Sequence, residues 1–124
     1  MKLRNIKGFT LVEIMIVVAI IGIIIAIAVP AFLRARENSR GRACQENLSK
    51  INGAAEQAAL EFNLPNGMGP IAVGGFVFPN GEGYLRVEPT CPAGGTYGGV
   101  TIGSDPDCTI GSSNSPFEPH ILQN

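Results

Sequence analysis

A single carboxylate, Glu13, lies inside an otherwise apolar stretch near the start of the chain. It is the only ionisable side chain in residues 9–33. A carboxylate transferred to an apolar environment costs several kcal/mol, or takes up a proton, unless it finds a partner. The chemistry expected at Glu13 is therefore charge pairing, with a cation that the apolar stretch does not itself supply.

The other residues that could carry chemistry do not combine into a catalytic set. His120 is the only histidine and lies near the C-terminus, where we expect a contact of the chain's tail rather than a base or a ligand. Asp105 and Asp107 lie two residues apart in a turn, and two carboxylates fall short of the roughly six to eight oxygens that calcium binds. The glycine pairs of the second half lack the spacing of phosphate-binding loops. The sequence predicts no enzyme, no cofactor and no metal site.

Residues 9–33 form an apolar segment that is longer than the about 20 residues needed to cross the hydrocarbon core of a membrane. A helix that is apolar on every side is buried on every side, in lipid or in other protein. Gly22 and Pro30 are its two weak points, because proline removes a backbone hydrogen bond and crowds the preceding turn. They indicate either a hinge that loosens or an ordinary kink, which membrane helices tolerate.

Residues 34–64 continue this helix with a different pattern. No proline lies between Pro30 and Pro65, and apolar residues recur every three or four positions, which places them on one side of a helix. We therefore expect one helix over residues 9–62, apolar all round in its first half and amphipathic in its second. The apolar stripe of the second half consists of Cys44, Leu48, Ile51, Ala55, Ala58 and Phe62.

Residues 65–124 contain 12 of the 16 glycines and eight of the nine prolines, which indicates short strands joined by turns. We expect a hairpin with strands near residues 96–102 and 108–110. The predicted fold class is α+β, a long N-terminal helix packed on a small antiparallel β-rich head, with domains at residues 1–8, 9–33, 34–64 and 65–124. The net charge of −1 gives no indication of a nucleic-acid partner.

The N-terminus combines several features around the apolar segment. A short basic leader ends at Gly8, Phe9 follows it, Glu13 is the fifth residue after that glycine, and Pro30 lies near the end of the apolar helix. This combination resembles the N-terminus of type IV pilins and type II secretion pseudopilins. The resemblance implies that residues 1–8 are a leader, that a prepilin peptidase cuts between Gly8 and Phe9, and that Phe9 is then N-methylated. It also implies a single-pass precursor, held in the lipid of the inner (cytoplasmic) membrane, that an assembly platform adds to a helical filament.

The resemblance gives Glu13 a partner as well. Cleavage frees the ammonium group of Phe9, which pairs with Glu13 of a neighbouring subunit. Glu13 would then be a docking charge, unsatisfied in the single chain and satisfied in a filament. A carboxylate that pairs with its own N-terminus one turn away, or that reaches the membrane interface, is the alternative.

Three functions fit the sequence to different degrees. The first is a structural subunit of a surface pilus. The second is a pseudopilin of a type II secretion system, in a periplasmic pseudopilus, although major pseudopilins typically bind calcium in a C-terminal loop and Asp105 and Asp107 do not complete such a set. The third is an anchored or secreted binding module, for which "VPA" before Phe32 resembles an ordinary signal-peptidase site. The length of the apolar segment and the charge of Glu13 argue against that last reading.

The three cysteines indicate an exported head. Cys91 and Cys108 flank the predicted hairpin, and many pilins carry a C-terminal disulfide loop, so we expect a disulfide between them. Closing a loop of this size contributes roughly 3 kcal/mol. Cys44 lies on the apolar stripe of the helix, where it is either a buried free thiol or the partner of one of the other two.

Overall fold

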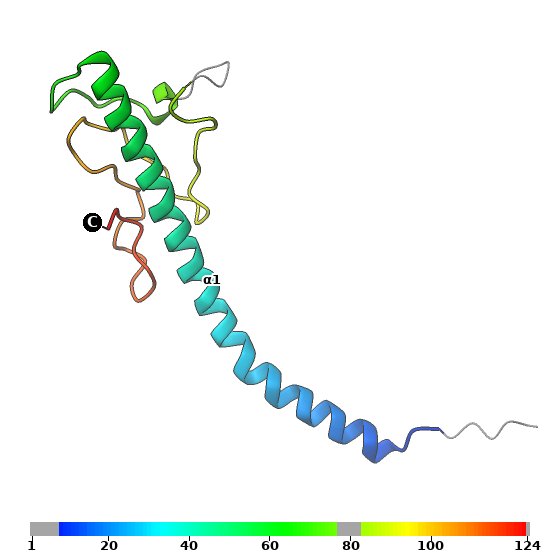
Figure 1. Cartoon of the computed structure of the whole chain (residues 1–124). Coiled ribbons are helices and arrows are strands. Elements are labelled where there is room, and N and C mark those ends of the chain that lie inside the picture. The colour runs from blue at the N-terminus through cyan, green and yellow to red at the C-terminus, as the bar shows by residue number, and fades with distance from the viewer. Residues whose placement is uncertain (1–7, 77–82, 124) are drawn as a thin grey trace, which may run out of the picture. The chain divides into compact units, whose positions relative to one another are not determined.

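The computed structural model describes residues 8–76 and 83–123 (Figure 1). The chain divides into two compact units, Met1–Arg34 and Ala35–Asn124. The α-helix α1, Leu11–Phe62, contributes residues to both units, and the short 3-10 helix η1, Val73–Phe76, belongs to the second. Except for Gly8, the predicted leader lies outside the described residues.

The predicted long helix is confirmed, with small differences at its two ends. It begins at Leu11 rather than at Phe9, and it ends at Phe62. Asn63 takes the left-handed conformation (φ 50°), and the N–H of Leu64 donates to the carbonyl of Ala59 at 2.9 Å. A left-handed residue followed by such a bond is the common way to close a helix, and Pro65 prevents its continuation.

The two predicted weak points lie inside α1. The helix continues through Gly22 and Pro30 without a break. A Cβ atom placed on Gly22 would meet nothing within 4 Å, so no close contact requires glycine there. The role of Gly22 and Pro30 as a hinge therefore stays a prediction.

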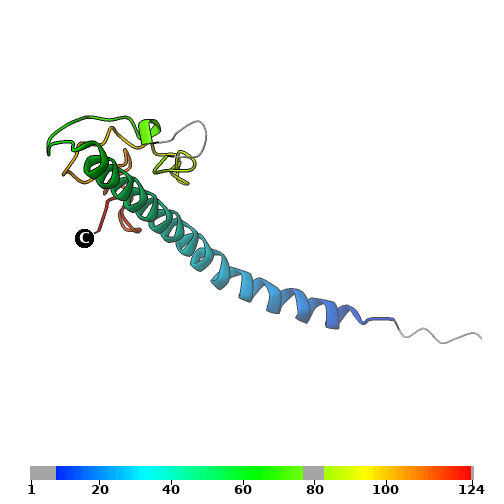
Figure 2. The same ribbon diagram turned by 45° about the horizontal axis from the view of Figure 1, so that its top comes forward.

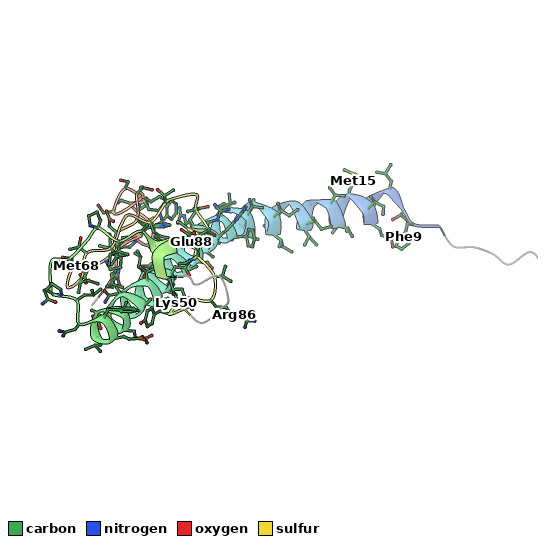
Figure 3. The ribbon with its side chains drawn as sticks, turned by 90° about the horizontal axis from the view of Figure 1, so that it is seen from above. Phe9, Met15, Lys50, Met68, Arg86 and Glu88 are labelled. Atoms are coloured by element: carbon green, nitrogen blue, oxygen red, sulfur yellow. The ribbon has the colours of Figure 1, made fainter. Side chains whose placement is uncertain are left out.

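The first unit presents apolar side chains on every side of the helix. Figure 3 shows them projecting in several directions from the ribbon around Phe9 and Met15. Phe9 is 85% exposed and Ile27 is 72% exposed, and the other large apolar side chains of this segment are exposed too. The helix is long and apolar enough to cross a membrane. An isolated helix with this surface would not stay dissolved in water.

In the second unit, α1 is amphipathic and the predicted stripe is confirmed except at its end. Phe62 is 58% exposed, so the buried stripe stops at Ala58. Two small residues that the pattern did not include, Gly41 and Ala54, are buried on the same side. The buried members are Gly41, Cys44, Leu48, Ile51, Ala54, Ala55 and Ala58.

The predicted β-rich head is not confirmed. Within residues 8–76 and 83–123 there is no extended strand, and pairing is limited to three isolated antiparallel bridges, Ile71↔Val100, Tyr97↔Cys108 and Gly111↔His120. The second of these joins the two segments expected to form a hairpin, but a single bridge replaces the ladder. Proline donates no backbone hydrogen bond and glycine weakens a strand, so this sequence propagates ladders poorly.

The head segments pack against α1 through two adjoining clusters. Figures 1 and 2 both show the chain after Phe62 running back along the second half of the helix. In the first cluster Ile51, Ala54, Ala55 and Ala58 of the helix contact Val73, Leu85, Val100 and Ile102. In the second, Cys44 and Leu48 contact Cys91 and Cys108. Tyr97 packs against both clusters.

The C-terminal segment is fixed to the helix by polar contacts around Glu118. Its backbone N–H donates to Asn38 Oδ1 at 3.2 Å, and Gln45 Nε2 donates to the carbonyl of Pro119 at 2.7 Å. The Glu118 carboxylate also lies 3.3 Å from Arg42 on the surface. Gly41 makes this close approach possible, because a Cβ atom there would lie 2.6 Å from the Glu118 carbonyl oxygen.

We predict opposite effects for two glycine substitutions in α1. Helix propensity alone favours alanine over glycine by roughly 0.5–1 kcal/mol. Gly53→Ala should show this stabilisation, because its Cβ meets nothing within 4 Å. Gly41→Ala should instead destabilise the second unit by about 1–3 kcal/mol, since the backbone of Glu118 must move away. Thermal unfolding followed by circular dichroism would compare them, and a rise in melting temperature for both variants would contradict the packing described.

Candidate functional site

The residues around the predicted cleavage position form a helix cap. Glu13 Oε2 accepts hydrogen bonds from the backbone N–H of Thr10 at 2.7 Å and from Thr10 Oγ1 at 3.0 Å. Thr10 Oγ1 in turn accepts from the backbone N–H of Glu13 at 3.3 Å. This reciprocal pair, with threonine at the cap and glutamate three residues later, is a capping box. It explains why α1 begins at Leu11.

The capping box corrects one expectation about Glu13. The carboxylate was expected to be unsatisfied in the single chain, yet it has two local donors. The pattern "TLVE" carried this signal, and the sequence reading missed it. Both donors use one oxygen, Oε2, which leaves Oε1 for a further donor. The docking role of Glu13 stays a prediction.

The peptide bond between Gly8 and Phe9 lies in an exposed position. Gly8 is exposed, and a Cβ atom placed on it would meet nothing within 4 Å. Phe9 is likewise exposed, ahead of the first helical turn. Cleavage at this bond and methylation of Phe9 are compatible with this geometry and remain predictions.

The second feature is a cluster of possible metal ligands in the second unit. One ligand atom from each of Cys44, Cys91, Cys108 and His120 lies within 4.8 Å of the others, and all four residues are buried. Cys91 Sγ is 3.5 Å from His120 Nδ1. This arrangement corrects the interpretation of His120 as a tail contact, because its side chain is 0% exposed and lies among the thiols.

Sequence reasoning missed this cluster because its members are far apart in the chain. Metal-binding cysteines are usually recognised as closely spaced pairs. Here a helix residue and three separate head segments each contribute a single residue. The available signal was the coincidence of three cysteines and a lone histidine in a chain otherwise without either.

The surroundings of the thiols affect their protonation. Burial raises the pKa of the Cys44 thiol to about 12, although a hydrogen bond from Tyr97 acts in the opposite direction. Burial also acts to raise the pKa of Cys91, but hydrogen bonds from the backbone N–H groups of Ala93 and Gly95, and from the neighbouring thiols, bring it below its ordinary value. Burial and the Cys44 contact raise the pKa of Tyr97. Hydrogen-bond donors are therefore directed at the sulfur atoms of Cys44 and Cys91.

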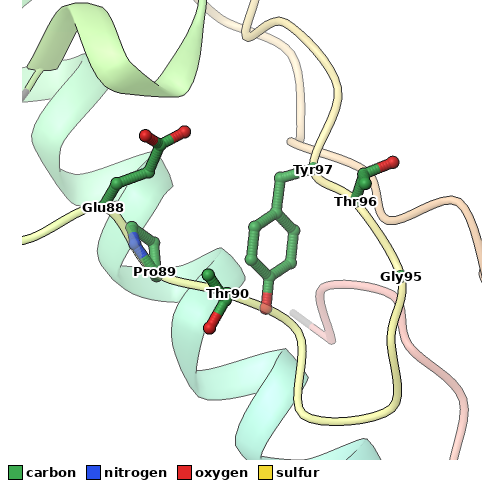
Figure 4. Close-up of a pocket in the computed structure, with 6 residues that line it drawn as sticks. All are labelled: Glu88, Pro89, Thr90, Gly95, Thr96 and Tyr97. Atoms are coloured by element: carbon green, nitrogen blue, oxygen red, sulfur yellow. The ribbon is translucent and has the colours of Figure 1, made fainter.

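A hollow lies beside the cluster, and Tyr97 separates the two. Figure 4 shows its ring among the residues that line the hollow, which are Glu88, Pro89, Thr90, Gly95, Thr96 and Tyr97. Asn47 Nδ2 donates to the Tyr97 hydroxyl and to the carbonyl of Thr90, at 3.1 Å in each case. These bonds fix the hydroxyl of Tyr97 next to Cys44.

The two other sequence predictions in the head have different outcomes. All three cysteines are free thiols in this structure, so the disulfide between Cys91 and Cys108 stays a prediction. Their sulfurs lie within 4.8 Å of each other, and the sulfur of Cys44 lies within the same distance of both. Among the described residues Asp105 and Asp107 belong to no group of three or more possible metal ligands, and the expectation of no calcium site there stays a prediction.

Comparison with known proteins identifies the family. Residues 3–29 match the prokaryotic N-terminal methylation motif. The chain is 47% identical over 55 residues to a fimbrial protein of Pseudomonas aeruginosa, an alignment that covers 44% of this chain and 36% of that protein. It is 50% identical over 48 residues to the type IV major pilin protein PilA of Myxococcus xanthus, covering 39% of this chain and 21% of that pilin.

A longer match extends the similarity beyond the N-terminus. The chain is 30% identical over 140 aligned residues to fimbrial protein Q of Moraxella bovis, covering 89% of each chain. The chain therefore belongs to the family of type IV pilins and fimbrial proteins, and the resemblance seen at its N-terminus is confirmed. Its matches to the Pseudomonas aeruginosa and Myxococcus xanthus proteins span about a third or less of the length of those proteins. No solved structure was found to match it.

Proposed function

We propose that this chain is a structural subunit of a type IV pilus-like filament. It is made as a membrane-anchored precursor, cleaved after Gly8, methylated at Phe9 and assembled through the apolar half of α1. The observation that carries the proposal is the first unit, which exposes apolar side chains on all sides around a single capped carboxylate. Such a surface must be covered, first by lipid and then by other copies of the same helix.

Assembly requires partner proteins that act on the N-terminus. A prepilin peptidase and methyltransferase would act on the exposed segment at Gly8 and Phe9, and an assembly platform in the inner membrane would take the subunit from lipid into the filament. The freed Phe9 ammonium of one subunit would then donate to Glu13 Oε1 of its neighbour. This leaves the capping bonds to Oε2 in place, so docking needs no unwinding of the first turn.

The second unit would lie outside the filament core, at the cell surface. Its three isolated antiparallel bridges agree with a head in which segments pair in antiparallel fashion. The named relatives are fimbrial proteins and pilins, which favours a pilus subunit over a secretion pseudopilin. The same relationship favours a structural role over an enzyme.

The experiment that tests this function is the intact mass and N-terminal sequence of the protein in a sheared cell-surface fraction. We expect an abundant chain that begins at methylated Phe9. The same mature chain found in membranes and missing from the sheared fraction would favour the pseudopilin. A chain that begins at Phe32, or that still carries Met1, would contradict the proposal.

A further inference from the structure

The buried cluster of three thiols and one imidazole has no role in filament assembly as proposed above. We propose that Cys44, Cys91, Cys108 and His120 bind one zinc ion in a closed, tetrahedral, structural site within the second unit. Four nitrogen and sulfur ligands without a place for water are the donor set of structural zinc sites. Soft thiolate ligands favour zinc over calcium, magnesium or manganese, which bind oxygen.

The distances fit this geometry. With zinc–sulfur bonds of about 2.3 Å and zinc–nitrogen bonds of about 2.0–2.1 Å, a sulfur and a nitrogen on one tetrahedral zinc are about 3.6 Å apart. The distance between Cys91 Sγ and His120 Nδ1 is 3.5 Å. All four ligand atoms lie within 4.8 Å of one another, and small rotations of the cysteine side chains would bring the longer pairs to the tetrahedral edge.

Hydrogen-bond donors around the sulfurs suit thiolates. The backbone N–H groups of Ala93 and Gly95 point to Cys91, and the Tyr97 hydroxyl contacts Cys44. Zinc binding would release the three thiol protons to solvent, leaving three thiolates and a neutral imidazole around a divalent cation. The site would then carry one net negative charge, which these neutral donors stabilise.

A disulfide would give new partners to only two of the four side chains, whereas zinc would bind all four. Joining Cys91 to Cys108 would leave the thiol of Cys44 and the imidazole of His120 buried without new partners. His120 Nε2 already has no hydrogen-bond partner in the described part of the chain, and Nδ1 faces only a sulfur. Buried polar groups without partners are costly, whereas a metal engages all four residues at once.

The position of the cluster gives the metal a structural role. Cys44 comes from α1, and the other three ligands come from three head segments, of which only those of Cys108 and His120 take part in isolated bridges. The packing is close: a Cβ atom on Gly95 would lie 2.7 Å from Cys108 Sγ. A small domain with a limited hydrophobic core commonly depends on a metal or a disulfide for its stability. One zinc ion would fasten the helix to all three segments.

The test uses the full chain, purified in detergent under reducing conditions without chelator. We expect one zinc per chain by elemental analysis, and three thiols that resist alkylation until a chelator removes the metal. Replacing zinc with cobalt should give the absorption of a tetrahedral thiolate complex. Zinc should also raise the melting temperature in a concentration-dependent way.

Matched variants distinguish zinc bound specifically by these four residues from non-specific zinc binding. Cys44→Ser and His120→Gln should weaken zinc binding by more than about a hundredfold, beyond the effect usual for outer-shell partners. Asp107→Asn, beside Cys108 but outside the cluster, should bind zinc normally. Equal losses in all three variants would overturn the proposal. A wild-type chain that is purified without zinc, and whose thiols react at the same rate after zinc is added, would also overturn it. So would a Cys91–Cys108 disulfide found in the mass of the chain from native surface material.

Discussion

Glu13→Gln should reduce filament assembly almost as severely as Glu13→Ala, while processing after Gly8 continues. Glutamine keeps the capping box, because its side-chain oxygen still accepts from Thr10, but it carries no charge. The Phe9 ammonium of the neighbouring subunit would then be buried without a counter-charge. Removing one partner of a buried ion pair costs about 3–5 kcal/mol, enough to reduce the assembled fraction by two orders of magnitude or more. The amount of mature subunit in the sheared fraction, relative to membranes, measures the effect.

Thr10→Ala is the matched control for Glu13→Gln. It removes the cap and both of the bonds to Thr10 Oγ1, yet it leaves the carboxylate in place. Loss of a helix cap costs about 1 kcal/mol, so this variant should assemble nearly normally. The opposite order, with Glu13→Gln assembling well and Thr10→Ala poorly, would show that Glu13 serves to start the helix and does not dock a neighbour.

Gly8→Leu should block processing completely, so that only a precursor that retains residues 1–8 accumulates in membranes. The structure makes this variant informative, because Gly8 is exposed and a Cβ atom placed on it would meet nothing within 4 Å. The fold should therefore be unaffected, and a loss of cleavage would reflect recognition by the peptidase. Intact mass of the membrane fraction distinguishes precursor from mature chain.

Gly22→Ala controls for the general effect of replacing a glycine in this unit. Its added Cβ also meets nothing within 4 Å, and it lies well inside α1. We expect normal cleavage, with the amount of filament reporting separately on whether flexibility at Gly22 matters.

Mature-length protein from the Gly8→Leu chain would show that the cleavage site has been misplaced.

Features that depend on neighbouring residues could be read from the sequence. The extent of α1, its apolar first half and the stripe from Cys44 to Ala58 follow from periodicity, and the structure confirms them. The family also follows from a short N-terminal pattern, and the comparisons confirm it. The capping box at Thr10 and Glu13 was equally local and could have been predicted, because its spacing alone defines it.

The sequence by itself determined the long helix, its change from apolar to amphipathic, and the position of the lone carboxylate, since backbone propensity and hydrophobic period act over a few turns. Only the tertiary structure decided that Cys44 meets Cys91, Cys108 and His120, and that Gly41 admits the backbone of Glu118. It also decided that Phe62 stays exposed. These contacts join residues far apart in the chain, and they depend on how glycine- and proline-rich segments fold back on the helix, which no local pattern specifies.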